Sequence, residues 1–96
     1  ATTEIYTLSL HDALPISYLG GDLSPRELAE RGYTGLDYHI GTMRAHEEWF
    51  DEARKFGLEI NVWTVNDEGS MKYLIGKGVD YITTDEPELL QSLLGK

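Results

Sequence analysis

Short apolar runs rich in β-branched and aromatic residues recur along the chain, and each follows a glycine at the end of a helix-like stretch. The glycines are Gly32, Gly57 and Gly78, and the runs are Leu36–Ile40, Ile60–Val65 and Val79–Thr83. A glycine commonly ends a helix in the left-handed conformation, and continuous apolar runs are typical of strands buried on both faces. The pattern therefore predicts three such strands, and we interpret the stretch at Tyr18 as the remnant of an earlier one.

Four helices are predicted between and after these strands. Their expected caps and first residues, in chain order, are Ser24 with Pro25 and Glu27, Thr42, Asn66 followed by Asp67 and Glu68, and Pro87. Apolar side chains recur at spacings of three and four residues, which places them on one face of each helix. These positions are His46, Trp49, Phe50, Ala53 and Phe56 in the second helix, Met71, Leu74 and Ile75 in the third, and Leu89, Leu90, Leu93 and Leu94 in the fourth.

The alternation of strands and helices predicts an α/β fold with a parallel sheet and right-handed crossovers. Two architectures fit this order: a small doubly wound sheet, or part of a (β/α)₈ barrel. A complete barrel needs about 250 residues, and this chain of 96 residues has about half of its units. In a barrel, we expect Asn61, Trp63 and Val65 to point into the interior.

Composition narrows the classes of partner. The chain is globular in character, with 41% hydrophobic and 26% charged residues, and its 17 acidic and 8 basic residues give a net charge of −9. Such a surface disfavours nucleic acid, because it repels a phosphate backbone. No apolar run has the length of a membrane span. The absence of cysteine excludes disulfides and thiolate metal sites and leaves the compartment open, with the cytoplasm slightly favoured.

Candidate chemistry lies where the predicted strands end, since ligands gather at the carboxyl ends of parallel strands. Trp63 either fills the core or forms a wall that packs on an apolar part of a substrate. Asn66 is expected to be a helix cap, and Asp85 a cap or turn residue, unless they contact a ligand. His39 ends a strand and is expected to be structural rather than catalytic. No paired carboxylates at a metal-binding spacing mark a strand end.

Two motifs in the second half of the chain resemble the carboxyl-terminal end of the glycerophosphodiester phosphodiesterase family. The first is Trp63-Thr64-Val65-Asn66, preceded by Gly57, and the second runs from Gly78-Val79-Asp80 through Ile82 and Thr84-Asp85 to Pro87. The segment "GLDYHIGTMRAHEEWFDEARKFG" also fits the preceding unit of the family, so the resemblance covers about residues 18–96. It implies the carboxyl-terminal half of a TIM (β/α)₈ barrel of the phospholipase C-like phosphodiesterase type.

The resemblance also implies a reaction and its cofactor. The family hydrolyses glycerophosphodiesters to an alcohol and glycerol 3-phosphate, with a divalent cation, Ca²⁺ or Mg²⁺. Its two catalytic histidines and its metal carboxylates belong to upstream motifs that this sequence lacks, so we expect no catalytic residue and no metal ligand here. Three positions match family motifs and are carried over as substrate-binding candidates: Trp63, Asn66 and Asp85.

The first seventeen residues differ in kind from the rest, with no lysine or arginine and no sustained helical period. Residues Ala1 to Ile16 match the translation of a DNA-sequencing adapter at every position. We therefore interpret residues 1–17 as a non-native segment and residues 18–96 as a partial family domain. On this interpretation, His11 and Asp12 only imitate an active-site pair.

The sequence thus predicts part of a metal-dependent phosphodiester hydrolase that is inactive by itself. Its expected partner is a small-molecule glycerophosphodiester, and the open edges of a partial sheet favour self-association. Two alternatives stay open: a different phospholipase C-like phosphodiesterase, and a self-contained α/β binding module without catalysis.

Overall fold

The computed structural model describes residues 6–9 and 17–95 and contains one five-stranded sheet in the order β1-β5-β4-β3-β2. The strands are β1 (Tyr6–Ser9), β2 (Ser17–Tyr18), β3 (Gly35–His39), β4 (Glu59–Trp63) and β5 (Tyr81–Thr84). Strands β2 to β5 are parallel to one another, and β1 joins the free side of β5 in an antiparallel sense. The parallel sheet that the sequence predicts is therefore present.

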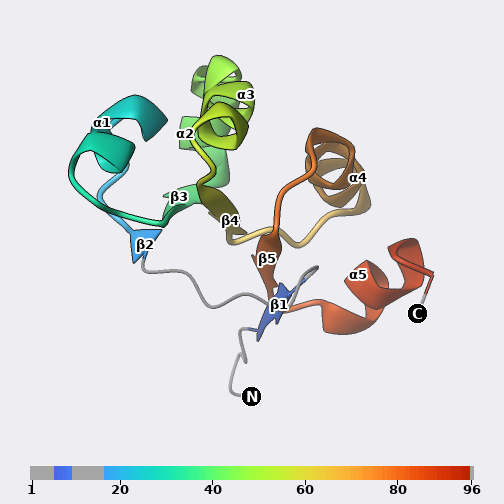
Figure 1. Ribbon diagram of the computed structural model, residues 1–96. Helices are drawn as coiled ribbons and strands as arrows, with labels where there is room; N and C mark the ends of the chain where they lie inside the picture. The colour runs from blue at the N-terminus through green and yellow to red at the C-terminus, as the bar shows by residue number, and fades with distance from the viewer. Residues whose placement is uncertain (1–5, 10–16, 96) are drawn as a thin grey trace.

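The described residues form five helices, one more than predicted, because two of them follow β3 in succession. They are α1 (Pro25–Glu30), α2 (Ile40–Ala45), α3 (Glu48–Lys55), α4 (Glu68–Lys77) and α5 (Pro87–Leu93). All of them lie on the same side of the sheet, which curves so that the helices fan outward from it (Figure 1). A doubly wound sheet carries helices on both faces, whereas a (β/α)₈ barrel carries them only on the outside. The arrangement is that of a barrel segment.

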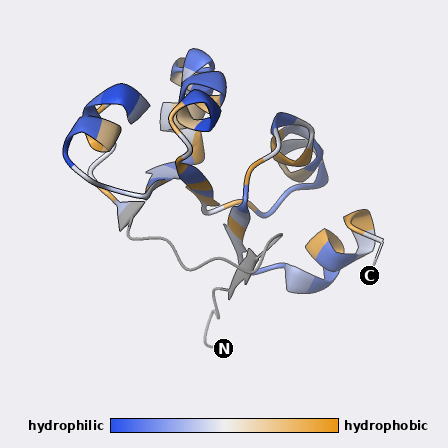
Figure 2. Cartoon of the chain, in the orientation of Figure 1, coloured by the Kyte–Doolittle hydropathy of each residue, from blue (hydrophilic) through white to orange (hydrophobic). Residues whose placement is uncertain are grey.

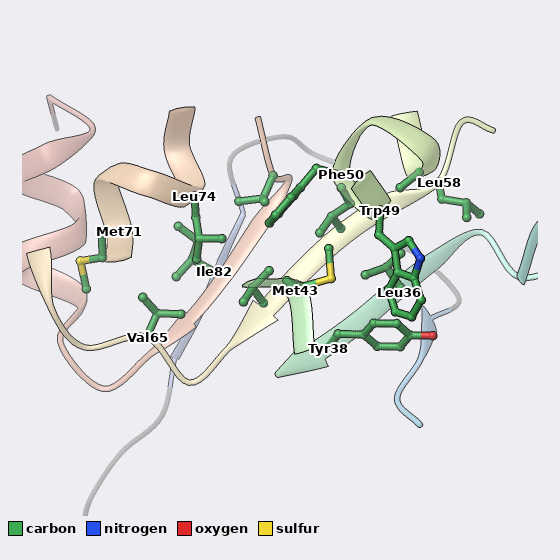
Figure 3. Close-up of a cluster of buried hydrophobic side chains, with 14 of the residues drawn as sticks. Leu36, Tyr38, Met43, Trp49, Phe50, Leu58, Val65, Met71, Leu74 and Ile82 are labelled. Atoms are coloured by element: carbon green, nitrogen blue, oxygen red, sulfur yellow. The ribbon is translucent and has the colours of Figure 1, made fainter. Parts of the chain in front are cut away.

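The hydrophobic core fills the layer between the sheet and the helices. Leu36, Tyr38 and Ile82 of the strands face Met43, Phe50, Met71 and Leu74 of the helices (Figure 3), and all of these side chains are buried. Hydrophobic colouring follows this inner layer, while the outer turns of α1 and α3 are hydrophilic (Figure 2). Burial of these apolar side chains on one face of each element is what holds the layers together.

The strand register separates two faces of the sheet. Leu36 pairs with Ile60 and Tyr38 with Val62 on the face that meets the helices. Because side chains alternate along a strand, the intervening pairs, Asp37 with Asn61 and His39 with Trp63, belong to the opposite face. The expectation that these strands are buried on both faces holds only in part for the face away from the helices. Asn61 and Tyr81 are buried there, Asp37 and Trp63 are partly exposed, and His39 is exposed.

Several local predictions are confirmed. Gly32, Gly57 and Gly78 have φ values of 84°, 71° and 76°, as expected for residues that end helices in the left-handed region. Ser24 and Glu27 form a reciprocal capping box at the start of α1, with Pro25 at the first helical position. Pro87 begins α5.

The predicted second helix differs most from the structure. Thr42 does not cap it, because the His39 side chain accepts a hydrogen bond from the Gly41 N–H and starts α2 at Ile40. A turn at His46 then separates α2 from α3, so the apolar stripe is divided between two short helices. Phe56 lies beyond the end of α3 and is 41% exposed, whereas the prediction buried it.

The interior positions predicted on β4 are right for Asn61 and Trp63 and wrong for Val65. Val65 is 1% exposed and packs in the core beneath α4. The reason is that β4 ends at Trp63, and the alternation of a strand does not extend into the loop that follows. Among the described helices, none has the length and apolar character that crossing a membrane requires.

Candidate functional site

The carboxyl ends of β3, β4 and β5 bring the candidate residues to one edge of the sheet. His39 is the last residue of β3, and Trp63 is the last residue of β4 and pairs with it in the register. Asn66 lies in the loop after β4, and Asp85 directly follows β5. Parallel strands end together at this edge, and barrel enzymes build their sites there.

Trp63 is half-buried and held in place by its neighbours. Its indole Nε1–H donates to the backbone carbonyl oxygen of Asp37 over 3.1 Å. Its ring meets the His39 imidazole edge to face, with centroids 5.1 Å apart and planes at 86°. The peptide bond between Trp63 and Thr64 is cis. With its N–H already bound, the indole offers a ligand only its aromatic surface.

Asn66 connects the two loops of the site. Its side-chain oxygen accepts hydrogen bonds from the Thr84 hydroxyl and from the Asp85 N–H, both at 3.1 Å. The Thr84 hydroxyl is fully buried and in turn accepts from the Glu86 N–H at 2.9 Å. Asn66 thus ties the start of α4 to the end of β5.

The predicted cap role of Asn66 is wrong. Asp67 caps α4, and its carboxylate accepts from the Ser70 N–H over 2.9 Å. The hydrogen bonds from Ser70 hold the pKa of the Asp67 carboxyl below its ordinary value. Both residues are good caps by type. Asn66 is committed instead to a partner eighteen residues along the chain, which the sequence does not reveal.

Asp85 is engaged through its backbone. Its N–H donates to Asn66, and it lies one residue before Glu86, at which α5 is capped. The structure therefore supports its interpretation as a turn residue. Asn66 and Asp85 are joined by this hydrogen bond, whereas the contacts of Trp63 are with Asp37 and His39 of β3.

A polar row on the sheet face away from the helices was not predicted from the sequence. Asn61 donates to the Thr83 hydroxyl over 3.1 Å, and Asp37 is the neighbour of Asn61 across β3 and β4. Burial raises the pKa of the Asp37 carboxyl, and the Asn61 side chain offsets this in part. One oxygen of Asp37 and one of Glu59 are buried without a hydrogen-bond partner. The sequence Leu-Asp-Tyr-His in β3 alternates between apolar and polar residues, and this alternation could have predicted a polar face.

The described residues do not fit a divalent cation. Across residues 6–9 and 17–95, no three histidine, aspartate or glutamate side chains converge in a group that could hold a metal ion. Ca²⁺ takes six to eight oxygen ligands, and Mg²⁺ requires near-octahedral geometry. These side chains therefore do not form a cation site by themselves.

Comparison with known proteins agrees with this geometry. The sequence model of the glycerophosphoryl diester phosphodiesterase family matches residues 23–89, which include the ends of β3, β4 and β5. The chain belongs to this family. The resemblance carried by the Trp63-Thr64-Val65-Asn66 motif and the residues around Asp85 is thereby confirmed.

Solved structures of the family share the fold. A glycerophosphodiester phosphodiesterase from Parabacteroides distasonis is 49% identical and superposes with a TM-score of 0.80 over 82% of this chain and 33% of its own. A protein from Silicibacter pomeroyi, named as a candidate glycerophosphoryl diester phosphodiesterase, is 28% identical with a TM-score of 0.70 over 84% of this chain and 30% of its own. The chain is therefore a segment of the family's (β/α)₈ barrel.

A curated relative extends the match. The glycerophosphodiester phosphodiesterase of Caldanaerobacter subterraneus subsp. tengcongensis is 28% identical over 93 residues, which make up 97% of this chain and 38% of the relative. The chain thus spans about a third of the length of the relatives that it matches.

Proposed function

We propose that this family chain supplies one wall of the substrate pocket of a glycerophosphodiester hydrolase. The reaction cleaves the diester to an alcohol and glycerol 3-phosphate. The observation that carries the proposal is Trp63, a half-buried indole fixed at a strand end with its only polar atom bound to Asp37. An aromatic surface held in this way suits the carbon skeleton of a small polar substrate.

Asn66 and Asp85 are proposed to support the pocket rather than to contact the ligand. Asn66 binds the Thr84 hydroxyl and the Asp85 N–H, so it fixes the loops on either side of the pocket wall. We propose that these two residues shape the substrate site mainly through that clamp. Trp63 is then the residue of the three that touches the ligand.

The proposed reaction also depends on a divalent cation, Ca²⁺ or Mg²⁺, which would neutralise phosphate charge. The described part of this chain offers no group of three ligating side chains for it. The chain also covers only about a third of its relatives. Both observations support our proposal that the 96-residue chain does not turn over substrate by itself.

Residues 18–96 are proposed to carry the family domain, and residues 1–17 to be non-native. The family match begins at residue 23, which supports this division. The alignment with the Caldanaerobacter relative spans 97% of the chain and reaches into the first segment. The nucleotide sequence of the source decides the question: a sequence unlike the adapter would refute the non-native origin.

A chimera tests the pocket wall. Residues 18–95 replace the matching segment of the Parabacteroides distasonis enzyme, and hydrolysis of glycerophosphocholine is assayed with Ca²⁺ or Mg²⁺. We expect an active chimera in which Trp63→Ala lowers kcat/KM about tenfold or more, since losing about 1.4 kcal/mol of ring contact gives that factor. Phe56→Ala is the control, because Phe56 is exposed beyond the end of α3.

Three outcomes would contradict the proposal. Full activity of the chimera after Trp63→Ala would remove Trp63 from the pocket. Metal-dependent turnover by the 96-residue chain alone would show that it contains a complete catalytic site. If the chain bound substrate without turnover while the chimera stayed inactive, a binding module would be the better description.

A further inference from the structure

The imidazole of His39 is exposed at the site edge, and its orientation is fixed. Nδ1 accepts a hydrogen bond from the Gly41 N–H over 2.8 Å. In a neutral imidazole with Nδ1 as acceptor, the proton is on Nε2. His39 therefore presents an Nε2–H donor, and the described residues provide no hydrogen-bond partner for it.

Gly41 makes this orientation possible. A Cβ added at Gly41 would lie 3.0 Å from Nδ1 and 3.3 Å from Cε1 of His39. Such contacts are tighter than the ring can accept without moving. The ring is thus seated between the Gly41 backbone and the indole of Trp63, whose centroid is 5.1 Å away.

The two rings supply complementary contacts at one place. Trp63 has no free donor, because its Nε1–H is bound to the Asp37 carbonyl oxygen. His39 has a donor directly beside that indole. A flat apolar surface next to a single fixed donor is suited to a ligand whose carbons carry hydroxyl groups.

Charge decides which oxygen of the ligand is bound. Arg44, the cation nearest to His39 in the chain, donates to the Ser70 hydroxyl over 2.9 Å and lies 4.5 Å above the Tyr73 ring. Both of these partners of Arg44 belong to α4. The chain as a whole carries a net charge of −9. A neutral donor in this field is better matched to an uncharged hydroxyl than to a phosphoryl oxygen.

We propose that His39 is a specificity residue that donates its Nε2–H to a hydroxyl of the glycerol moiety, whose carbons pack on Trp63. This inference rests on the proposed function, and it adds to it the part of the substrate that this wall binds. His39 also caps α2, so its test needs a readout that a merely structural role would leave unchanged.

The test uses the 96-residue chain and NMR signals of the His39 ring, the Trp63 indole N–H and the Gly41 amide. Glycerophosphocholine and phosphocholine, which lacks glycerol, are titrated at millimolar concentration and equal ionic strength. We expect the glycerol compound alone to shift both rings. His39→Asn retains a cap acceptor for Gly41 and should weaken this binding roughly three- to tenfold, as for the loss of one hydrogen bond. His39→Phe, which retains a ring beside Trp63, should weaken it similarly.

His46→Asn is the matched control. His46 also contacts a tryptophan, stacking on Trp49 with centroids 3.9 Å apart, but it follows the end of α2, whereas His39 precedes its start. It should leave the titration unchanged. Equal shifts from phosphocholine, unweakened binding in His39→Asn, or the absence of any shift would each overturn the inference. The proposed function is judged separately by the Trp63 dependence of the chimera, so the two can fail independently.

Discussion

The indole N–H of Trp63 donates to the backbone carbonyl oxygen of Asp37, and so joins β4 to the neighbouring strand β3 near their carboxyl ends. The bond restricts the indole to one orientation. It also leaves the Asp37 side chain on the sheet face away from the helices, next to Asn61. A single hydrogen bond thus connects Trp63 to the strand that carries Asp37 of the polar row.

We predict that Trp63→Phe lowers the free energy of unfolding by about 1 kcal/mol, the usual contribution of one hydrogen bond. Phenylalanine retains an aromatic ring at this position but loses the N–H donor together with the five-membered ring of the indole. Urea unfolding of the whole chain measures the change, and Trp63→Ala should cost more because the ring is lost as well. A Trp63→Phe protein as stable as the parent would show that the indole bond contributes nothing in solution.

For Asn66→Ala, we predict a loss of about 1–3 kcal/mol in the free energy of unfolding. The substitution leaves the hydroxyl of fully buried Thr84 without its acceptor, and the Asp85 N–H as well. Asn66→Asp retains an acceptor oxygen and should cost less.

Asp67→Ala provides the comparison for Asn66. Asp67 is the cap of α4, so its loss should also lower the free energy of unfolding. Thermal or urea unfolding of the three variants ranks them. If Asn66→Ala were neutral, the clamp between the two loops would not stabilise the fold.

Asn66 and Asp67 also illustrate what the sequence could predict. Glycine positions, the capping box at Ser24 and the apolar runs are local signals, so the alternation of strands and helices followed from them, although the division between α2 and α3 did not. The choice between Asn66 and Asp67 as cap depends on Thr84, which only the packed sheet brings near. The residue types Asn and Asp indicated a helix cap near this position, but the sequence did not reveal the hydrogen-bond partner of either residue.

In the candidate site too, the sequence predicted local features and missed contacts that depend on the packed structure. The sequence predicted Trp63 near the carboxyl end of a strand, and it is the last residue of β4, within the segment that matches the family. The cap formed by His39 was missed because histidine is a weak cap by type, and it acts here through the small Gly41. The polar row containing Asp37 was missed because the strand was interpreted as apolar on both faces.

We predict that Asp37→Asn raises stability at neutral pH and has little effect at pH 3. Burial raises the pKa of the Asp37 carboxyl above its ordinary value of 3.8, so the folded state holds its proton more tightly than the unfolded state. Stability is therefore lost as pH rises from 3.8 through the folded value. Asparagine does not ionise, so the variant does not lose stability at this position as pH rises. Urea midpoints measured at both pH values test the prediction.

Asp67→Asn is the control of opposite sign. The pKa of Asp67 is lowered by its bonds from Ser70, so its carboxylate contributes stability that is present above 3.8 and is lost as pH falls through the folded value. Asp67→Asn should therefore destabilise the chain at neutral pH and have little effect in strong acid. If both substitutions changed stability equally at all pH values, ionisation would not be the cause.

The last prediction concerns the edge of the sheet at β2. This strand pairs with β3 only at Gly35 and Leu36, so the outer edge of β3 from Asp37 onward has no strand beside it in the described part of the chain. Open edges pair readily with other chains. Leu19, directly after β2, is 64% exposed at this edge. We therefore predict concentration-dependent self-association through the β2 edge, detectable by sedimentation velocity.

Leu19→Lys should weaken this association, raising the dissociation constant about tenfold or more. Burying a leucine is worth roughly 1.5–3 kcal/mol, and a lysine at a sheet edge opposes pairing with a second copy. Phe56→Lys is the matched control, because Phe56 is also an exposed large apolar residue, at 41%, but lies after α3 on the helical side. A chain that stays monomeric at every concentration would contradict the prediction. Weakening by Phe56→Lys alone would instead place the contact on the helices, where the sheet edge has no part in it.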